Sequence, residues 1–190
     1  PPNEKAHEIR QIGQYFNEEV CWRPVVAPHH TATAISLVGG GAPPRPGELV
    51  RAHGGVLVLD ELLEFNTKVQ AALREPIEQK TLSLSRGSFH RSFPCDFLIL
   101  ATTNLCRCGE FVPRKKNRCR CSSRYLRNYM EKLSGPFVDR FSILLLTQNW
   151  FSSSKKEDLV SLDTILREIE DTKNYIFQTR KQKFVNEIGK

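Results

Sequence analysis

The sequence predicts an α/β fold built around a parallel sheet, and two observations support this prediction. Short apolar runs without polar alternation recur along the chain, at Val56 to Leu59, Phe97 to Ala101 and Phe141 to Leu146. Such runs are typical of strands that are buried on both faces. Segments with helical spacing separate them, which favours parallel pairing through crossover helices. We therefore expect three buried strands, with polar side chains gathered at their carboxyl ends.

The remaining elements are predicted from local signals. Helices are expected at Glu4 to Glu19, at Thr67 to Gln79 with Asn66 as the N-cap, at Ser123 to Leu133, and beyond Ser154. A hairpin is expected around Gly87, with strands at Thr81 to Ser85 and Phe89 to Phe93. The Pro-rich and Gly-rich stretch from Arg23 to Gly47 is predicted to be irregular. We expect residues 1–151 to form one domain and residues 152–190 to begin a helical lid or extension.

Composition excludes some classes of protein. The 190 residues include 28 Lys and Arg against 21 Asp and Glu, a formal net charge of +7. No apolar run is long enough to span a bilayer and the N-terminus has no signal core, so we expect a cytoplasmic protein without membrane contact. The missing initiator Met suggests a piece of a longer chain. Basic residues are concentrated between Arg107 and Lys132, which suits either a nucleic acid or a solvated charged loop.

Four polar residues at or near the ends of the predicted strands have side chains that phosphoryl transfer can use. Asp60 and Glu61 follow an apolar strand like a Walker B element, in which the Asp holds the Mg²⁺ shell and the Glu orients the attacking water. Asn104 ends the next strand and can position that water, and Arg140 can act as an arginine finger toward a neighbouring subunit. The alternatives are two exposed acids, a turn-forming Asn, and an Arg paired with Asp139 or with a helix C-terminus.

A phosphate loop is missing from this sequence. No Gly-x-x-x-x-Gly-Lys-Ser/Thr motif occurs in the 190 residues. Gly39-Gly40-Gly41 lacks the Lys and the helix that would have to follow it. The chain is therefore either not a nucleotide hydrolase, or the loop lies upstream of Pro1.

Four of the six cysteines lie close together in the sequence, at Cys106, Cys108, Cys119 and Cys121. Four thiolates are the right number and type of ligand for tetrahedral Zn²⁺. The spacing differs from the commoner Cys-x-x-Cys, and four reduced thiols in a flexible basic loop are the alternative. His29 and His30 have a weaker claim, because adjacent histidines in a Pro-rich loop are more often structural or substrate-facing.

Several sequence blocks, in order, resemble one known family. They are Arg23-Pro24-Val25-Val26-Ala27-Pro28-His29-His30, Gly39-Gly40-Gly41-Ala42, Pro46-Gly47-Glu48, Ala52 to Leu62, Leu73 to Glu78, Thr103 to Gly109, and Ser134-Gly135-Pro136 through Phe141. Together, from about Arg23 to Leu146, they resemble the magnesium-chelatase-like AAA+ ATPases of the bacterial ComM/YifB type.

The resemblance implies a partial AAA+ P-loop-type core of a hexameric ring that uses ATP and Mg²⁺. By position, Asp60 and Glu61 match the Walker B pair, Asn104 matches sensor 1 and Arg140 matches the arginine finger. The family's phosphate loop would precede Pro1, so we expect this chain alone to hydrolyse ATP poorly. The sensor 2 arginine is not located.

The resemblance also implies two pore-directed segments, an insert from Val38 to Arg51 and a hairpin from Thr81 to Phe93. Arginines in or beside them are candidate nucleic-acid contacts, at Arg45, Arg51, Arg86 and Arg91. The family suggests a motor that remodels DNA by branch migration during recombination. The alternatives are an ATPase that remodels a protein or chelatase partner, and a non-enzymatic zinc-stabilised binding module.

Overall fold

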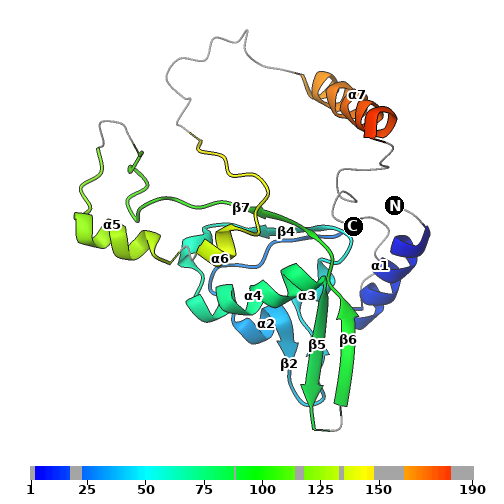
Figure 1. Cartoon of the computed structure of the whole chain (residues 1–190). Coiled ribbons are helices and arrows are strands. Elements are labelled where there is room, and N and C mark those ends of the chain that lie inside the picture. Colours follow the sequence, from blue (N-terminus) through cyan, green and yellow to red (C-terminus); the bar gives the residue numbers. More distant parts are fainter. Residues whose placement is uncertain are drawn as a thin grey trace. The chain divides into compact units, whose positions relative to one another are not determined.

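The computed structural model describes residues 3–17, 23–87, 89–113, 118–132, 135–147 and 161–180 (Figure 1). Its contacts divide the chain into two units, Pro1–Leu144 and Leu145–Lys190. The second unit contains the predicted C-terminal helix, α7 (Leu162–Arg180). Parts of the sequence predictions lie outside the described residues: Glu19, Leu133 and Ser134, residues 114–117 of the basic segment, and residues 148–160 and 181–190 of the two predicted domains.

The core of the first unit is a three-stranded parallel sheet, as predicted. Its order is β1 (Val25–Val26), β4 (Val56–Leu59) and β7 (Leu98–Ala101), and both pairings are parallel. In the register, Leu59 lies opposite Ala101, so β4 and β7 end side by side. This register brings the residues that follow the two strands to one edge of the sheet.

The prediction of a third buried strand at Phe141 to Leu146 is wrong. The described part of this segment, residues 141–147, contains no strand, and Ile143 and Leu145 are 74% and 83% exposed. An apolar run becomes a strand only when a neighbouring strand supplies hydrogen-bond partners, and none of the described residues does so here. The third strand of the sheet is instead β1, inside the stretch that was predicted to be irregular.

Three helices cover one face of this sheet: α2 (Ala34–Val38), α3 (Glu48–Arg51) and α4 (Thr67–Gln79) (Figure 1). Leu37, Leu49 and Leu73 from these helices are fully buried together with Leu57 and Leu59 of β4. Burying an aliphatic side chain of this size contributes about 1.5–3 kcal/mol, so these five leucines contribute substantially to the stability of the first unit. The α4 prediction is confirmed, because Asn66 accepts a hydrogen bond from the Lys68 backbone N–H at 2.9 Å.

The opposite face of the sheet is not covered by described residues at β7, where Leu98 and Leu100 are 61% and 56% exposed. The prediction that all the strands are buried on both faces is therefore wrong for β7. Its inward side chains, such as Ile99, pack against the core. The apolar run was read correctly as a strand, but its composition does not reveal which faces are covered.

Two hairpins lie side by side in the first unit (Figure 1). The short one pairs β2 (Gly39–Gly40) with β3 (Arg45–Pro46), and the long one pairs β5 (Thr81–Arg86) with β6 (Phe89–Pro94). The long hairpin confirms the sequence prediction. At its tip the Arg86 guanidinium donates to the Gly41 carbonyl oxygen at 2.6 Å, so the two hairpins are in direct contact.

The N-terminal helix α1 (Asn3–Tyr15) is anchored to the core by a buried histidine. His53 is 3% exposed, and its Nδ1 accepts from the Asp96 backbone N–H at 3.1 Å. The ring proton therefore lies on Nε2, which donates to Glu8 of α1 at 3.1 Å. Lys5 adds an ion pair with the Asp96 carboxylate at 2.9 Å.

Two further helices end the first unit, α5 (Ser123–Met130) and α6 (Gly135–Val138). The α5 helix confirms the prediction of a helix beginning at Ser123, and Ser122 caps it by accepting from the Tyr125 backbone N–H at 3.3 Å. Among the described residues, no helix combines the length and the apolar character that crossing a bilayer requires.

Candidate functional site

The candidate catalytic residues meet at the edge of the sheet where β4 and β7 end. Asp60 and Glu61 follow β4 directly, and Asn104 lies three residues beyond Ala101, the last residue of β7. All three of these side chains belong to exposed residues. The parallel register therefore brings together two carboxylates and an amide, as the sequence predicted for a sheet of this class.

Thr102 fixes the turn that carries the two acids. Its hydroxyl donates to the Asp60 carboxylate and accepts from the Glu61 backbone N–H at 3.3 Å. Its carbonyl oxygen also accepts from the Leu62 backbone N–H at 2.8 Å. One residue thus holds the end of β7 against the turn after β4. Nothing local in the sequence distinguishes Thr102 from the neighbouring Thr103, so this role was not predicted.

Glu61 adopts a left-handed backbone conformation, with φ of +54°. For a residue other than glycine this conformation costs about 1–2 kcal/mol. Such strain persists where the surrounding structure enforces it, and it is concentrated at functional sites. Here the Thr102 hydrogen bonds hold the conformation, which turns the chain from β4 into the short 3₁₀ helix η1 (Leu62–Glu64).

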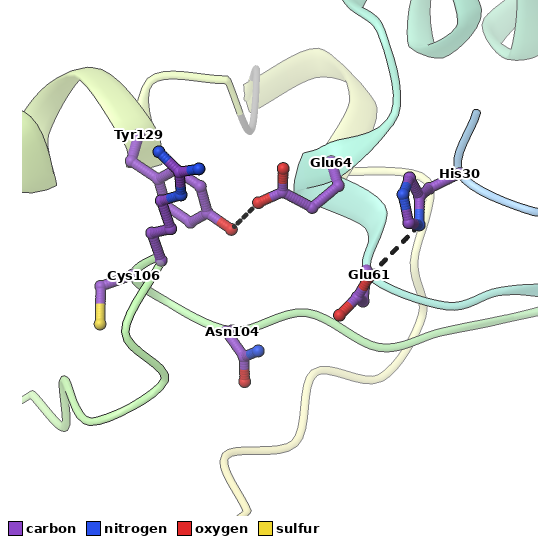
Figure 2. A pocket seen from close by; sticks show the side chains of 7 residues that line it. His30, Glu61, Glu64, Asn104, Cys106 and Tyr129 are labelled. Carbon is purple, nitrogen blue, oxygen red and sulfur yellow. Dashed lines mark hydrogen bonds and ion pairs between the residues drawn. The ribbon is translucent and has the colours of Figure 1, made fainter.

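A pocket opens beside this turn, and Figure 2 shows its lining. The lining residues are His30, Glu61, Glu64, Asn104, Cys106, Arg107 and Tyr129. His30 Nδ1 lies 3.2 Å from Glu61 Oε2 (Figure 2), so the second of the two adjacent histidines is a direct partner of the candidate water-orienting acid. Arg140 is not among the described residues that line the pocket.

Helix α5 forms the far wall of the pocket through Tyr129. The phenol donates to Glu64 Oε1 at 2.8 Å (Figure 2). Burial and this hydrogen bond raise the pKa of Tyr129 well above its usual value, so the phenol keeps its proton and donates. Lys132, just beyond the helix, donates to the Leu63 carbonyl oxygen at 3.3 Å. These two bonds tie α5 to η1, directly after Glu61.

Arg140 lies just beyond α6 and reaches α4. Its guanidinium donates to the Glu78 carboxylate in an ion pair. The sequence left open an arginine finger, a pair with Asp139 and an interaction with a helix C-terminus. The observed partner is Glu78, 62 residues earlier, in the last turn of α4. In this isolated chain Arg140 is thus bound to its own subunit.

The four candidate nucleic-acid arginines differ in their surroundings. Arg45 and Arg86 are exposed on the two hairpins, and the Arg86 guanidinium donates a hydrogen bond to the backbone carbonyl oxygen of Gly41. Arg51 is half-buried and pairs with Glu48 at 3.2 Å. Arg91 lies over the Tyr15 ring, 5.1 Å from its centroid. Arg91 is also exposed, so Arg51 is the least accessible of the four.

The four predicted cysteine ligands converge. The Cys106 and Cys108 sulfurs lie 3.2 Å apart, Cys119 lies 3.5 Å from Cys108, and all four Sγ atoms, including that of Cys121, lie within 4.8 Å of one another. Tetrahedral Zn–S bonds of 2.3 Å would place the sulfurs about 3.8 Å apart. Four converging thiols are a ligand set that fits Zn²⁺ and leaves no position for a fifth ligand.

The pKa values of the cluster's thiols diverge. The Cys121 backbone N–H lowers the pKa of Cys119, but desolvation and hydrogen bonds to the other thiols outweigh it and raise that pKa to about 12. Desolvation and the hydrogen bond to Cys108 raise the pKa of Cys121. Hydrogen bonds from the Glu110 backbone N–H and from the Cys106 thiol lower the pKa of Cys108 to about 7. Exposed arginines flank the cysteines in the sequence, at Arg107, Arg118 and Arg120. Cys95, by contrast, is buried in the core, and burial raises its pKa to about 12.

The fold and the edge of the sheet define a class of protein. A parallel α/β sheet whose central strand is followed by Asp60 and Glu61, beside a strand followed three residues later by Asn104, is a partial P-loop-type core. The comparisons with known proteins specify the family. Residues 3–154, well over half of the chain, match the model of the family described as magnesium chelatase, subunit ChlI, and the chain belongs to this family.

Curated relatives support the assignment. The chain is 41% identical over 152 residues to the uncharacterized protein YifB of Salmonella typhimurium and 42% identical over 148 residues to YifB of Escherichia coli. It is 43% identical over 121 residues to the competence protein ComM of Haemophilus influenzae. These alignments cover 76%, 75% and 64% of this chain, but only 29%, 29% and 23% of the respective relatives. The chain thus spans less than a third of their length.

Proposed function

We propose that this chain is part of an AAA+ ATPase that forms a cytoplasmic homohexameric ring and remodels DNA by branch migration during recombination. The observation that carries the ATPase proposal is the edge of the sheet, where Asp60, Glu61 and Asn104 meet. The strained conformation of Glu61, held by Thr102, supports a chemical role for that carboxylate. Family membership supports the same class of activity.

The residues at this edge fit the cofactors of the proposal, ATP and Mg²⁺. The Asp60 carboxylate is exposed and already accepts one hydrogen bond, which leaves oxygen lone pairs for the water shell of a cation. Bound Mg²⁺ would neutralise charge on the ATP phosphates. Glu61 would orient the attacking water, and Asn104 would hold that water in line. The phosphate loop, absent from these 190 residues, would come from a longer form of the protein.

The ATPase proposal is tested in such a longer form, in which a phosphate-loop segment precedes Pro1. Glu61→Gln keeps the shape of the side chain and removes its charge, so hydrolysis should fall about 100-fold or more, in the range for loss of a general base, while ATP still binds. Glu75→Gln is the matched control, because Glu75 is exposed on α4 outside the pocket. Unchanged hydrolysis in Glu61→Gln would refute the assignment.

The arginine-finger proposal needs a variant that separates it from the ion pair with Glu78. A trans-acting arginine contributes roughly 10³–10⁵ in rate, so Arg140→Ala should lose most hydrolysis at nearly unchanged ATP affinity. Glu78→Gln breaks the same ion pair but leaves the guanidinium, and it should keep its turnover. If both variants lose thermal stability equally and both keep turnover, Arg140 is structural and the finger proposal fails.

Exposed arginines on the two hairpins support DNA as the partner. Arg86 and Arg45 lie on neighbouring hairpins, and a phosphate backbone is the polyanion that such side chains suit. Binding of single-stranded DNA to the 190-residue chain, followed by fluorescence anisotropy across a salt series, tests this. Each lost phosphate contact should reduce the salt slope by about 0.7. Arg45→Ala should show this reduction, and Arg10→Ala, exposed on α1, should not.

Two alternative functions predict different results in the same assays. An ATPase that remodels a protein or chelatase partner predicts hydrolysis without salt-dependent DNA binding. A non-enzymatic binding module predicts bound zinc without hydrolysis in any longer form. Zn²⁺ at the cysteine cluster is also the third cofactor of our proposal, and the convergence of the four thiols favours it.

A further inference from the structure

The cysteine cluster joins two segments that both reach the candidate catalytic edge. Cys106 lies two residues after Asn104 and is fully buried, and it lines the same pocket as Glu61. At the other end of the cluster, Cys121 directly precedes Ser122, the cap of α5. The sulfurs of Cys106 and Cys119 lie 3.8 Å apart. A metal at the cluster would therefore connect the loop after β7 to the start of α5.

Helix α5 completes the connection. The Tyr129–Glu64 and Lys132–Leu63 hydrogen bonds attach it to η1, and Thr102 attaches the turn at Glu61 back to the end of β7. With a metal in place, these contacts and the cluster would form a closed ring of linked segments beside the pocket. Without a metal, the two segments meet through weaker contacts between their thiols, such as that of Cys119 with Cys106 at 3.8 Å.

We infer that Zn²⁺ bound by Cys106, Cys108, Cys119 and Cys121 positions Asn104 against Glu61, by fixing the loop after β7 to helix α5. The cysteines are positioning residues in this inference and take no part in the reaction. Its consequence for ATP hydrolysis rests on the function proposed above. Its structural content, a bound metal that immobilises residues 103–105, does not.

The first measurement is the metal content of the 190-residue chain, purified with reductant and without chelator. Wild-type protein should carry one Zn²⁺ ion per chain, and Cys119→Ser should lose it because three thiolates no longer close the site. Cys95→Ala is the matched control and should retain zinc, since Cys95 lies in the core outside the cluster. Wild-type protein without zinc would overturn the inference.

The second measurement is the motion of the loop, from ¹⁵N relaxation with and without a chelator. With zinc, the amides of residues 103–105 should be as rigid as those of α4, with order parameters of about 0.85, and removal of zinc should lower them below about 0.6. The α4 amides should stay rigid in both states, which shows that the fold persists. A loop that stays rigid after the metal is removed would refute the positioning role.

These readouts require no hydrolysis, so they separate this inference from the proposed function. If zinc immobilises the loop but Glu61→Gln leaves hydrolysis unchanged, the positioning stands and the catalytic assignment fails. If hydrolysis depends on Glu61 but zinc leaves the loop unaffected, the catalytic assignment stands and the inference fails.

Discussion

The left-handed conformation of Glu61 leads to a prediction in which glycine stabilises the protein more than alanine does. Glu61→Ala and Glu61→Gly both remove the carboxylate and its contact with His30. They differ only in backbone freedom. At φ of +54° alanine keeps a strain of about 1–2 kcal/mol. Glycine releases that strain but loses about 0.5–1 kcal/mol through its greater freedom in the unfolded chain. Glu61→Gly should therefore be the more stable variant, by about 0.5–1 kcal/mol.

The control for this comparison is Glu64, at the end of η1, which is not among the left-handed residues of the described chain. There the order should reverse, and Glu64→Ala should be more stable than Glu64→Gly by about 0.5–1 kcal/mol. Urea denaturation of the four variants measures the differences, which correspond to a few tenths of a molar in the midpoint at the usual m-values. If the alanine variant is the more stable one at both positions, Glu61 is not strained, and its conformation no longer supports a chemical role for its carboxylate.

Two further predictions concern the packing around β1 and the N-terminal helix. A Cβ on Gly55 would overlap the Pro24 carbonyl oxygen, so Gly55→Ala should lower the free energy of unfolding by about 3 kcal/mol, and a loss below about 1 kcal/mol would contradict the geometry. Burial disfavours ionisation of Asp96, but hydrogen bonds and charges from Lys5 and Lys80 outweigh it and lower its pKa. A carboxylate whose pKa is lower in the folded than in the unfolded state stabilises the protein at pH values above its unfolded pKa, about 3.9. This stabilisation is lost as the pH falls through the folded-state pKa. Asp96→Asn should therefore cost up to about 1 kcal/mol at pH 7 and nothing measurable near pH 2, in urea titrations at both pH values.

Elements with local signals were predicted correctly from the sequence. The α4 helix begins and ends where Asn66 and the apolar spacing indicated, because an N-cap bonds to a backbone group two residues away. The long hairpin was found through Gly87, whose φ of +57° suits a residue without a side chain. The edge that carries Asp60 and Asn104 was also predictable, because parallel strands end together. These features depend on neighbours in the sequence or on one general rule of sheets.

Contacts between distant segments could not be predicted in this way. His30 with Glu61, Tyr129 with Glu64 and Arg140 with Glu78 each pair residues at least 31 positions apart, and each could have had other partners of the right charge. The segment from Phe141 to Leu146 shows the same limit for backbone structure. Its composition suits a strand, but a strand forms only where the edge of a sheet supplies hydrogen-bond partners for its backbone.

The exposed apolar side chains of β7 also determine how this chain should be handled in solution. Leu98 and Leu100 lie on an edge strand of the described sheet, and Ile143 and Leu145 add further water-exposed aliphatic surface. Exposed edges of this kind pair with other chains, against which a net charge of +7 provides electrostatic repulsion. Salt screens that repulsion, so concentrated samples should associate as ionic strength rises. Dilute, low-salt conditions are therefore the appropriate ones for the denaturation and relaxation measurements.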